Sequence, residues 1–164
     1  MKTIADILEK MAKLHNFLIK MNYKIITAES CTGGFLSYIF TYFSGASSYF
    51  DKGFIVYSDD AKNQILNVNI NLLKKFTAVS HEVCGDMVRK IDSNHHADII
   101  ISVTGYLDFY NSIERNGLVY FGIKFPDGEI VIEKKQYFIG RNDNRINFAY
   151  DVIDVLCEKF DLYN

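Results

Sequence analysis

The sequence predicts an α/β fold, with residues 1–164 forming a single three-layer α/β/α domain around a mixed, mostly parallel sheet. Two observations predict this fold. Helical and strand-like segments follow one another in the order α-β-α-β-α-α-β-β-β-α, which favours a sheet covered by helices. The run ADIIISVTG, 97–105, is almost continuously apolar, as is typical of a strand buried on both faces. A chain of 164 residues suits one such domain.

The first half of the chain is expected to alternate helices with strands. Near the N-terminus, apolar side chains recur every three to four residues, as on the buried face of an amphipathic helix. Two short runs rich in β-branched and aromatic residues predict strands. The first run leads into a longer apolar segment, which the sequence SGASS ends. Acidic residues, which favour helix N-termini, follow the second run. The expected elements are a helix over 3–21, a strand over 23–28, a helix over 32–43, a strand over 52–58 and a helix over 59–66.

The second half is expected to add two helices, three strands and a final helix. Ser80 is a suitable N-cap for the helix that follows it. The sequence PDG, 126–128, lies between two apolar runs and predicts a hairpin. The last segment has the apolar spacing of an amphipathic helix. The expected elements are helices over 70–76 and 81–93, strands over 97–105, 117–125 and 129–139, and a helix over 142–160.

The composition argues against several classes of function. The formal net charge is −2 and charges of both signs are scattered, so there is no basic stripe for nucleic acid. Cys31, Cys84 and Cys157 are far apart and odd in number, which favours a reducing cytosol over a disulfide framework or a metal site. The charged N-terminal segment is unlike a secretory signal, and no apolar run reaches the roughly 18 residues of a membrane span. We therefore expect a cytoplasmic protein without nucleic-acid or membrane partners.

The stretch AESCTGGF, residues 28–35, stands where the first strand gives way to a helix. Ligands of α/β sheets bind outside the carboxyl ends of strands, and a helix N-terminus there favours an anion. Adjacent glycines would let a substrate approach the backbone. Ser30 or Thr32 could instead merely cap the helix, with the glycines allowing close helix–sheet packing. The candidate binding residues are Glu29, Ser30, Cys31, Thr32, Gly33 and Gly34.

Ser30 is a candidate nucleophile, but a serine hydroxyl needs a base. None of the four histidines is an obvious partner. A lysine made neutral by burial can serve instead, and Lys62 would meet Ser30 if their two strands are neighbours. Lys62 could equally be an ordinary solvated lysine. Cys31 is either a second candidate nucleophile, since helix N-termini lower thiol pKa values, or a small buried residue. Asp59 and Asp60 lack the companion spacing of a metal site, so no metal is expected.

Five blocks of the sequence together resemble the CinA C-terminal domain family. These blocks are AESCTGG, SYFDKGFIVYSDDAK, TAVSHEV, ADIIISVTG and NGLVYFGI, and the resemblance covers nearly the whole chain. Family members, also named competence/damage-inducible proteins, are nicotinamide-nucleotide amidohydrolases (NMN deamidases, PncC). The resemblance implies conversion of nicotinamide mononucleotide (NMN) to nicotinic acid mononucleotide and ammonia, in pyridine-nucleotide salvage and without a cofactor. It also implies a homo-oligomer and a stand-alone version of a domain that longer relatives carry after another domain.

The resemblance further implies a role for each site residue. Ser30 would attack the carboxamide carbon, Lys62 would be its base, and Tyr57 would assist by a hydrogen bond. Backbone N–H groups in the segment 31–34 would stabilise the oxyanion. An arginine near the last helix would hold the nucleotide phosphate, unless it is only a solvated residue at the helix start. The remaining predicted substrate-binding residues are Thr104 and Gly105 after the buried strand, and Arg141 and Arg145, with Arg145 preferred.

Two segments depart from the family pattern. Asp59–Asp60 replaces a common Asn-Glu, and the added negative charge would favour a protonated Lys62. The segment 104–117 replaces a loop rich in glycine and proline with bulky side chains, which would change or fill the edge of the substrate site. An alternative function is therefore a catalytically silent family member that binds a nucleotide or a protein partner. The bulky residues are Tyr106, Leu107, Phe109 and Tyr110.

Overall fold

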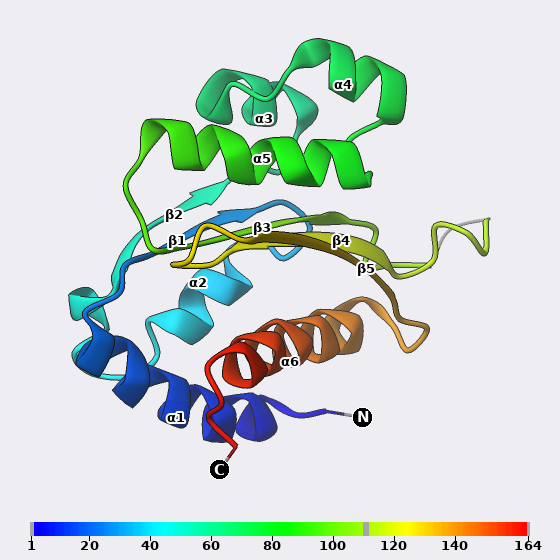
Figure 1. Cartoon of the computed structure of the whole chain (residues 1–164). Coiled ribbons are helices and arrows are strands. Elements are labelled where there is room, and N and C mark those ends of the chain that lie inside the picture. The colour runs from blue at the N-terminus through cyan, green and yellow to red at the C-terminus, as the bar shows by residue number, and fades with distance from the viewer. Residues whose placement is uncertain (1, 110–111, 164) are drawn as a thin grey trace.

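The computed structural model describes residues 2–109 and 112–163, and its elements follow the predicted order (Figure 1). Tyr110, noted above for its bulk, lies outside the described residues. The helices are α1 (Ile4–Met21), α2 (Phe35–Phe40), α3 (Asp59–Leu66), α4 (Ile70–Phe76), α5 (His81–Asn94) and α6 (Arg141–Lys159), with a short 3-10 helix at Ala46–Ser48. The strands are β1 (Ile25–Glu29), β2 (Phe50–Ile55), β3 (Ile99–Gly105), β4 (Leu118–Lys124) and β5 (Ile130–Gln136).

The five strands form one mixed sheet in the order β2-β1-β3-β4-β5. β1 pairs in parallel with β2 and with β3, whereas β4 is antiparallel to both β3 and β5. Four strands therefore run in the same direction, and the hairpin predicted at PDG joins β4 to β5. Helices α3, α4 and α5 lie on one side of the sheet, and α1, α2 and α6 lie on the other (Figure 1). The predicted three-layer α/β/α fold is confirmed.

The two connections that follow β1 and β2 lie on opposite faces of the sheet, and a crevice lies at the carboxyl end of β1. The connection to β2 runs through α2 on one face, whereas the connection from β2 to β3 runs through α3, α4 and α5 on the other face (Figure 1). Ligands of α/β sheets bind outside the carboxyl ends of the strands, at the point where chain connections lie on opposite faces of the sheet. Ser30 directly follows β1 and therefore lies at the crevice.

A separate apolar core lies on each face of the sheet. The core beneath α1, α2 and α6 includes Ile25, Phe121 and Phe148, and the core beneath α5 includes Ile26 and Met87. All five residues of β1 are buried, because the strand is covered on both faces. The two cores fix the position of the carboxyl end of β1. They thereby also fix the position of the site residues that follow it.

The predicted helix over 32–43 is wrong in its length, since α2 spans only Phe35–Phe40. Gly33 and Gly34 have φ angles of 62° and 97°, in the left-handed region that other residues rarely adopt. These angles are incompatible with an α-helical turn, so the glycines form a turn ahead of the helix rather than its first turn. The glycines are therefore needed for a change of chain direction between β1 and α2.

We expect Phe148→Ala to lower the free energy of unfolding by about 3–5 kcal/mol, because it leaves a cavity under the sheet. The Phe148 ring is fully buried in α6 and packs edge-on against Phe121, with ring centroids 5.6 Å apart. Urea denaturation measures the change. Phe138→Ala is the matched control, since Phe138 is 56% exposed and should cost less than about 0.5 kcal/mol. Equal losses in the two variants would contradict this description of the core.

Candidate active site

The alternation of side chains along β1 sends its last residues to opposite faces. Successive side chains of a strand point to opposite sides of the sheet. The Thr27 hydroxyl lies 2.9 Å from that of Ser37 in α2, and the Glu29 carboxylate also faces α2. Ser30 continues the ladder, donating its N–H to the Val103 carbonyl at 3.1 Å, and its side chain faces α3. The end of β1 therefore directs side chains to α2 on one face of the sheet, and the next residue directs its side chain to the crevice on the other face.

The Glu29 carboxylate caps α2. It accepts hydrogen bonds from the backbone N–H groups of Gly34 and Leu36, both at 3.0 Å, and from the Ser37 N–H at 2.8 Å. The Ser37 hydroxyl donates to it as well, at 2.6 Å. N-terminal helix N–H groups otherwise lack partners, so a carboxylate stabilises them. Neither the Ser30 nor the Thr32 side chain makes a capping bond to α2, which leaves the Ser30 hydroxyl available for another role.

Lys62 reaches the Ser30 hydroxyl from the second turn of α3. Ser58 is the N-cap of this helix, and its side chain accepts a hydrogen bond from the Ala61 N–H at 3.0 Å. The Lys62 side chain is only 1% exposed, and its Nζ lies 3.1 Å from Ser30 Oγ. The same nitrogen donates to the carbonyls of Val56 and Tyr57 at 3.2 and 3.4 Å. Buried lysines are rare unless they have such partners.

Burial lowers the pKa of the Lys62 ammonium below its ordinary value, because desolvation disfavours the charged form. The Asp59 carboxylate, 4.0 Å from Nζ, acts in the opposite direction and raises this pKa. Burial is the larger effect, and the Asp59 side chain is 61% exposed, where water screens its charge. The net direction favours the neutral amine that can accept a proton.

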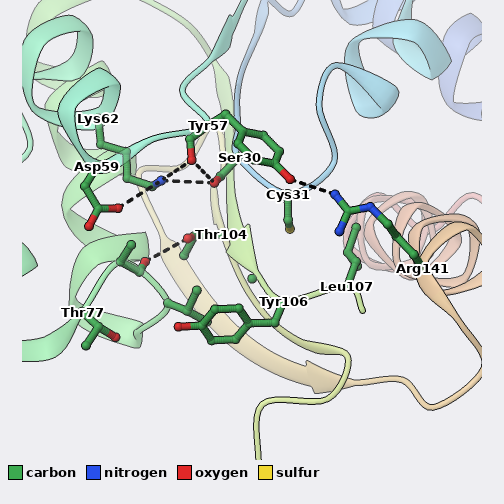
Figure 2. A pocket seen from close by; sticks show the side chains of 13 residues that line it. Ser30, Cys31, Tyr57, Asp59, Lys62, Thr77, Thr104, Tyr106, Leu107 and Arg141 are labelled. Carbon is green, nitrogen blue, oxygen red and sulfur yellow. Dashed lines mark hydrogen bonds and ion pairs between the residues drawn. The ribbon is translucent and has the colours of Figure 1, made fainter. Parts of the chain in front are cut away.

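Ser30 and Lys62 open onto a cavity of about 300 Å³ (Figure 2). Its lining includes seven of the residues predicted from the sequence, namely Ser30, Cys31, Tyr57, Lys62, Thr104, Gly105 and Arg141. The other five predicted residues do not line it, namely Glu29, Thr32, Gly33, Gly34 and Arg145. Within the stretch AESCTGG, Ser30 and Cys31 therefore face the cavity, and the residues around them support these two.

Tyr57 and Arg141 meet across the mouth of the cavity (Figure 2). The Arg141 Nη2 donates to the Tyr57 hydroxyl at 2.8 Å. The Tyr57 hydroxyl is thus directed to Arg141, and the contact of Tyr57 with Ser30 is through its backbone carbonyl, at 3.4 Å. Arg141 is the first residue of α6, where the helix dipole disfavours a cation. Arg145 instead donates to Asn142 of its own helix at 3.2 Å.

The cavity floor combines a buried thiol with a close strand contact. Burial raises the pKa of the Cys31 thiol to about 12, so the thiol stays protonated at neutral pH. Gly105 ends β3, where an added Cβ would lie 2.6 Å from the Leu118 carbonyl oxygen. Thr104 donates its hydroxyl to the Ala78 carbonyl at 2.8 Å (Figure 2). This bond holds the segment before α5 against the end of β3.

That segment, Thr77–Val79, lines the cavity and was given no role from the sequence. It lies within the block TAVSHEV that carried part of the resemblance, but its small side chains offered no ionisable group to single out. Tyr106 and Leu107, two of the bulky residues noted in the sequence, also line the cavity. Phe109 is largely exposed and does not line it.

Within residues 2–109 and 112–163, no three His, Cys, Asp or Glu side chains are grouped in a way that could hold a metal ion. None of the helices in this described part of the chain combines the length and the apolar character needed to cross a bilayer.

Comparison with known proteins shows similarity over almost the whole chain. Residues 8–160 match the family model of the CinA C-terminal domain. The nicotinamide-nucleotide amidohydrolase PncC of Enterobacter agglomerans is 32% identical over 138 residues, which are 83% of this chain and 84% of that protein. A CinA-like protein of Prochlorococcus marinus is 41% identical over 127 residues, 76% of this chain. The match spans only 30% of the length of that relative.

Solved structures of related proteins share the fold. A competence/damage-inducible protein of Agrobacterium tumefaciens superposes with a TM-score of 0.87 at 29% identity, over 97% of this chain and 96% of that one. A competence damage-inducible protein of Klebsiella pneumoniae gives a TM-score of 0.87 at 26% identity, over 96% of this chain and 99% of that one.

We expect Glu29→Gln to lower the free energy of unfolding by about 2–3 kcal/mol, because an amide nitrogen would face backbone donors that lose their acceptor. Urea denaturation measures the loss. Asp51→Asn is the control, since it makes the same acid-to-amide change on the surface of β2 and should cost less than about 0.5 kcal/mol. A Glu29→Gln protein as stable as the wild type would refute the capping role.

Proposed function

The chain belongs to the CinA C-terminal domain family, and we propose that it hydrolyses the carboxamide of nicotinamide mononucleotide to nicotinic acid mononucleotide and ammonia. The observation that carries this proposal is the Ser30 hydroxyl at the cavity, 3.1 Å from the buried amine of Lys62. Similarity to a relative named as a nicotinamide-nucleotide amidohydrolase supports the choice of substrate. Whatever further segments this protein shares with its longer relatives, the chemistry proposed here needs only residues of this chain.

In the first step, Ser30 Oγ attacks the carboxamide carbon and its proton passes to Lys62. A neutral amine has two N–H groups and one lone pair. Its N–H groups donate to the carbonyls of Val56 and Tyr57, which leaves the lone pair for the serine proton. In the resting site the Ser30 hydroxyl donates a hydrogen bond to the Tyr57 carbonyl at 3.4 Å. Because this bond is long, the hydroxyl readily exchanges it for a bond to Lys62. Ser30 is favoured over Cys31 as the nucleophile, because the thiol stays protonated and buried.

The attack places negative charge on the carboxamide oxygen, which needs hydrogen-bond donors. Two of the four N–H groups in the segment 31–34 are already used, since Gly33 donates to the Ser30 carbonyl and Gly34 donates to Glu29. The Cys31 N–H group is therefore the proposed oxyanion donor, because Cys31 lines the cavity whereas Thr32 does not. One such donor is worth about 3–4 kcal/mol of barrier in serine hydrolases.

Collapse of the tetrahedral intermediate breaks the C–N bond, and protonated Lys62 returns its proton to the leaving nitrogen, which departs as ammonia. The product of this step is an ester between Ser30 and the nicotinoyl group. A water molecule then attacks the ester, with Lys62 accepting its proton, and the ester bond breaks to release the acid and restore the Ser30 hydroxyl. Each proton that Lys62 accepts is donated back within the cycle.

Arg141 is the proposed partner of the nucleotide phosphate. Its guanidinium lines the cavity, and a planar fork of donors suits a phosphate. A helix N-terminus is an unfavourable place for a cation unless an anion binds beside it. Thr104, Gly105 and Tyr106 also line the cavity, and the ring and ribose would lie against them.

A catalytically silent protein that binds a nucleotide or a protein partner is the alternative. One observation favours it, namely that the bulky side chains of Tyr106 and Leu107 line the cavity. The cavity still measures about 300 Å³, the lower end of the range for small-molecule sites. The two functions differ in turnover, which a direct assay separates.

We expect the purified protein to release ammonia from NMN, and Ser30→Ala to reduce kcat by about 10⁴–10⁶-fold, because the nucleophile is gone. Coupled ammonia detection gives the rates. Calorimetry should show that Ser30→Ala still binds NMN, since Arg141 and the cavity walls are unchanged. Cys31→Ala is the control and should keep most of the activity. Binding without turnover in the wild type would establish the silent alternative, and full activity in Ser30→Ala would end the serine mechanism.

Asp59→Asn should move the acid limb of the kcat/KM profile to lower pH. Asp59 raises the pKa of Lys62, so its removal lowers that pKa and leaves the amine neutral in more acidic solution. Rates measured across the acid range test the shift. Asp60→Asn is the matched control, because it removes the neighbouring charge, which forms no ion pair with Lys62 in the described structure. A shift toward higher pH would contradict the role of Lys62 as base.

A further inference from the structure

Asn144 is a fully buried amide in the first turns of α6 that joins two walls of the cavity. Its Nδ2 donates to the Leu107 carbonyl at 2.7 Å. Its Oδ1 accepts from the N–H groups of Ile139 and Gly140, at 3.1 and 3.4 Å. The side chain is 0% exposed, so all three bonds form away from water. All three lead to backbone rather than to other side chains, and they tie together two segments that are distant in the sequence.

Both segments carry residues that face the cavity. Leu107 lines the cavity itself, and Gly140 directly precedes Arg141, whose guanidinium lines the mouth. Figure 2 shows Leu107 and Arg141 on the same side of the cavity. Asn144 does not line the cavity and touches no part of it that a substrate could reach. Its influence on a substrate must therefore pass through the backbone that it holds.

The start of α6 depends on this amide. The N-cap residue, Gly140, has no side chain and no side-chain capping bond. Asn144 Oδ1 instead accepts hydrogen bonds from the N–H groups of Gly140 and of the residue before it, and so anchors the backbone that leads into the helix. Packing alone does not require an amide there, because a buried polar group is costly unless every bond is made. The bonds that Asn144 makes fix where the helix begins, and so where Arg141 stands.

We propose that Asn144 is a positioning residue that sets the separation between Arg141 and the Ser30–Lys62 pair, and thereby selects substrates that carry a phosphate. This inference rests on the proposed function, in which Arg141 binds the phosphate while Ser30 attacks the carboxamide. Ser30 and Lys62 are held by β1, β2 and α3, none of which bonds to Asn144. Loss of the amide should therefore weaken phosphate recognition and leave the reacting pair in place.

The test compares NMN with nicotinamide riboside, which has the same carboxamide but no phosphate. Asn144→Asp keeps an oxygen for Ile139 and Gly140 but turns a second oxygen toward the Leu107 carbonyl. We expect the KM for NMN to rise about tenfold while kcat changes less than about threefold, since small displacements of a binding group carry large penalties. The kcat/KM for the riboside should stay within about twofold, so the preference for NMN falls about tenfold.

Two further variants make the test specific. Arg141→Ala should abolish the preference directly, and adding Asn144→Asp to it should change nothing more, because the two residues act through one contact. Val152→Ala is the stability control, since Val152 is equally buried in α6 but has no bond to the two segments. It should affect both substrates alike. Where Asn144→Asp does not fold, Asn144→Ser replaces it, because serine is too short to reach Leu107.

The outcomes separate this inference from the function on which it rests. An Asn144 variant that retains the wild-type preference for NMN, or loses rate equally with both substrates, overturns the positioning role while the amidohydrolase stands. A wild-type protein that neither binds nor hydrolyses NMN overturns the proposed function, and the role of Asn144 falls with it. A wild-type protein that hydrolyses both substrates equally well leaves the amidohydrolase intact and refutes phosphate selection.

Discussion

The exclusion of water from one amine is the constraint on which the site depends. Lys62 can act as a base only if its proton is weakly held, and burial provides this condition while two carbonyls at the end of β2 supply its hydrogen bonds. Those carbonyls stand beside Ser30 because β2 pairs in parallel with β1. The sheet order, the start of α3 and the depth of the cores therefore all support the proton transfer proposed between Ser30 and Lys62.

Glu29, the last residue of β1, has a structural role, whereas Ser30, the residue that follows, is the proposed nucleophile. Glu29 is buried with its carboxylate on the N–H groups of α2, and it fixes the turn in which the two glycines stand. The side chain of Ser30, one residue later, points to the other face of the sheet. It makes no hydrogen bond that caps α2. Because the Glu29 carboxylate fixes the turn, the Ser30 hydroxyl has a defined position although it takes no part in capping the helix.

Local patterns were enough to predict the elements, since burial on one or two faces leaves its period in the sequence. No such pattern predicts that β1 pairs with β2. The sequence therefore predicts a contact between Lys62 and Ser30 only on the condition that these two strands are neighbours. The short α2 was missed because apolar content does not reveal backbone angles. The sequence favoured Arg145 over Arg141, but only Arg141 lines the cavity, because the orientation of the first turn of α6 leaves no trace in the sequence. Asn144 gave no signal because its partners are all backbone groups.

The two sides of the cavity come from different parts of the chain. The proposed nucleophile and its proposed base belong to the first half of the chain, whereas Tyr106, Leu107 and Arg141 come from the second half. Mutation can thus remodel one side without disturbing the other. If the proposed amide hydrolysis holds, descendants of a common ancestor are free to keep the Ser30–Lys62 pair and to change the amide that it cleaves, which makes this architecture well suited to evolutionary divergence.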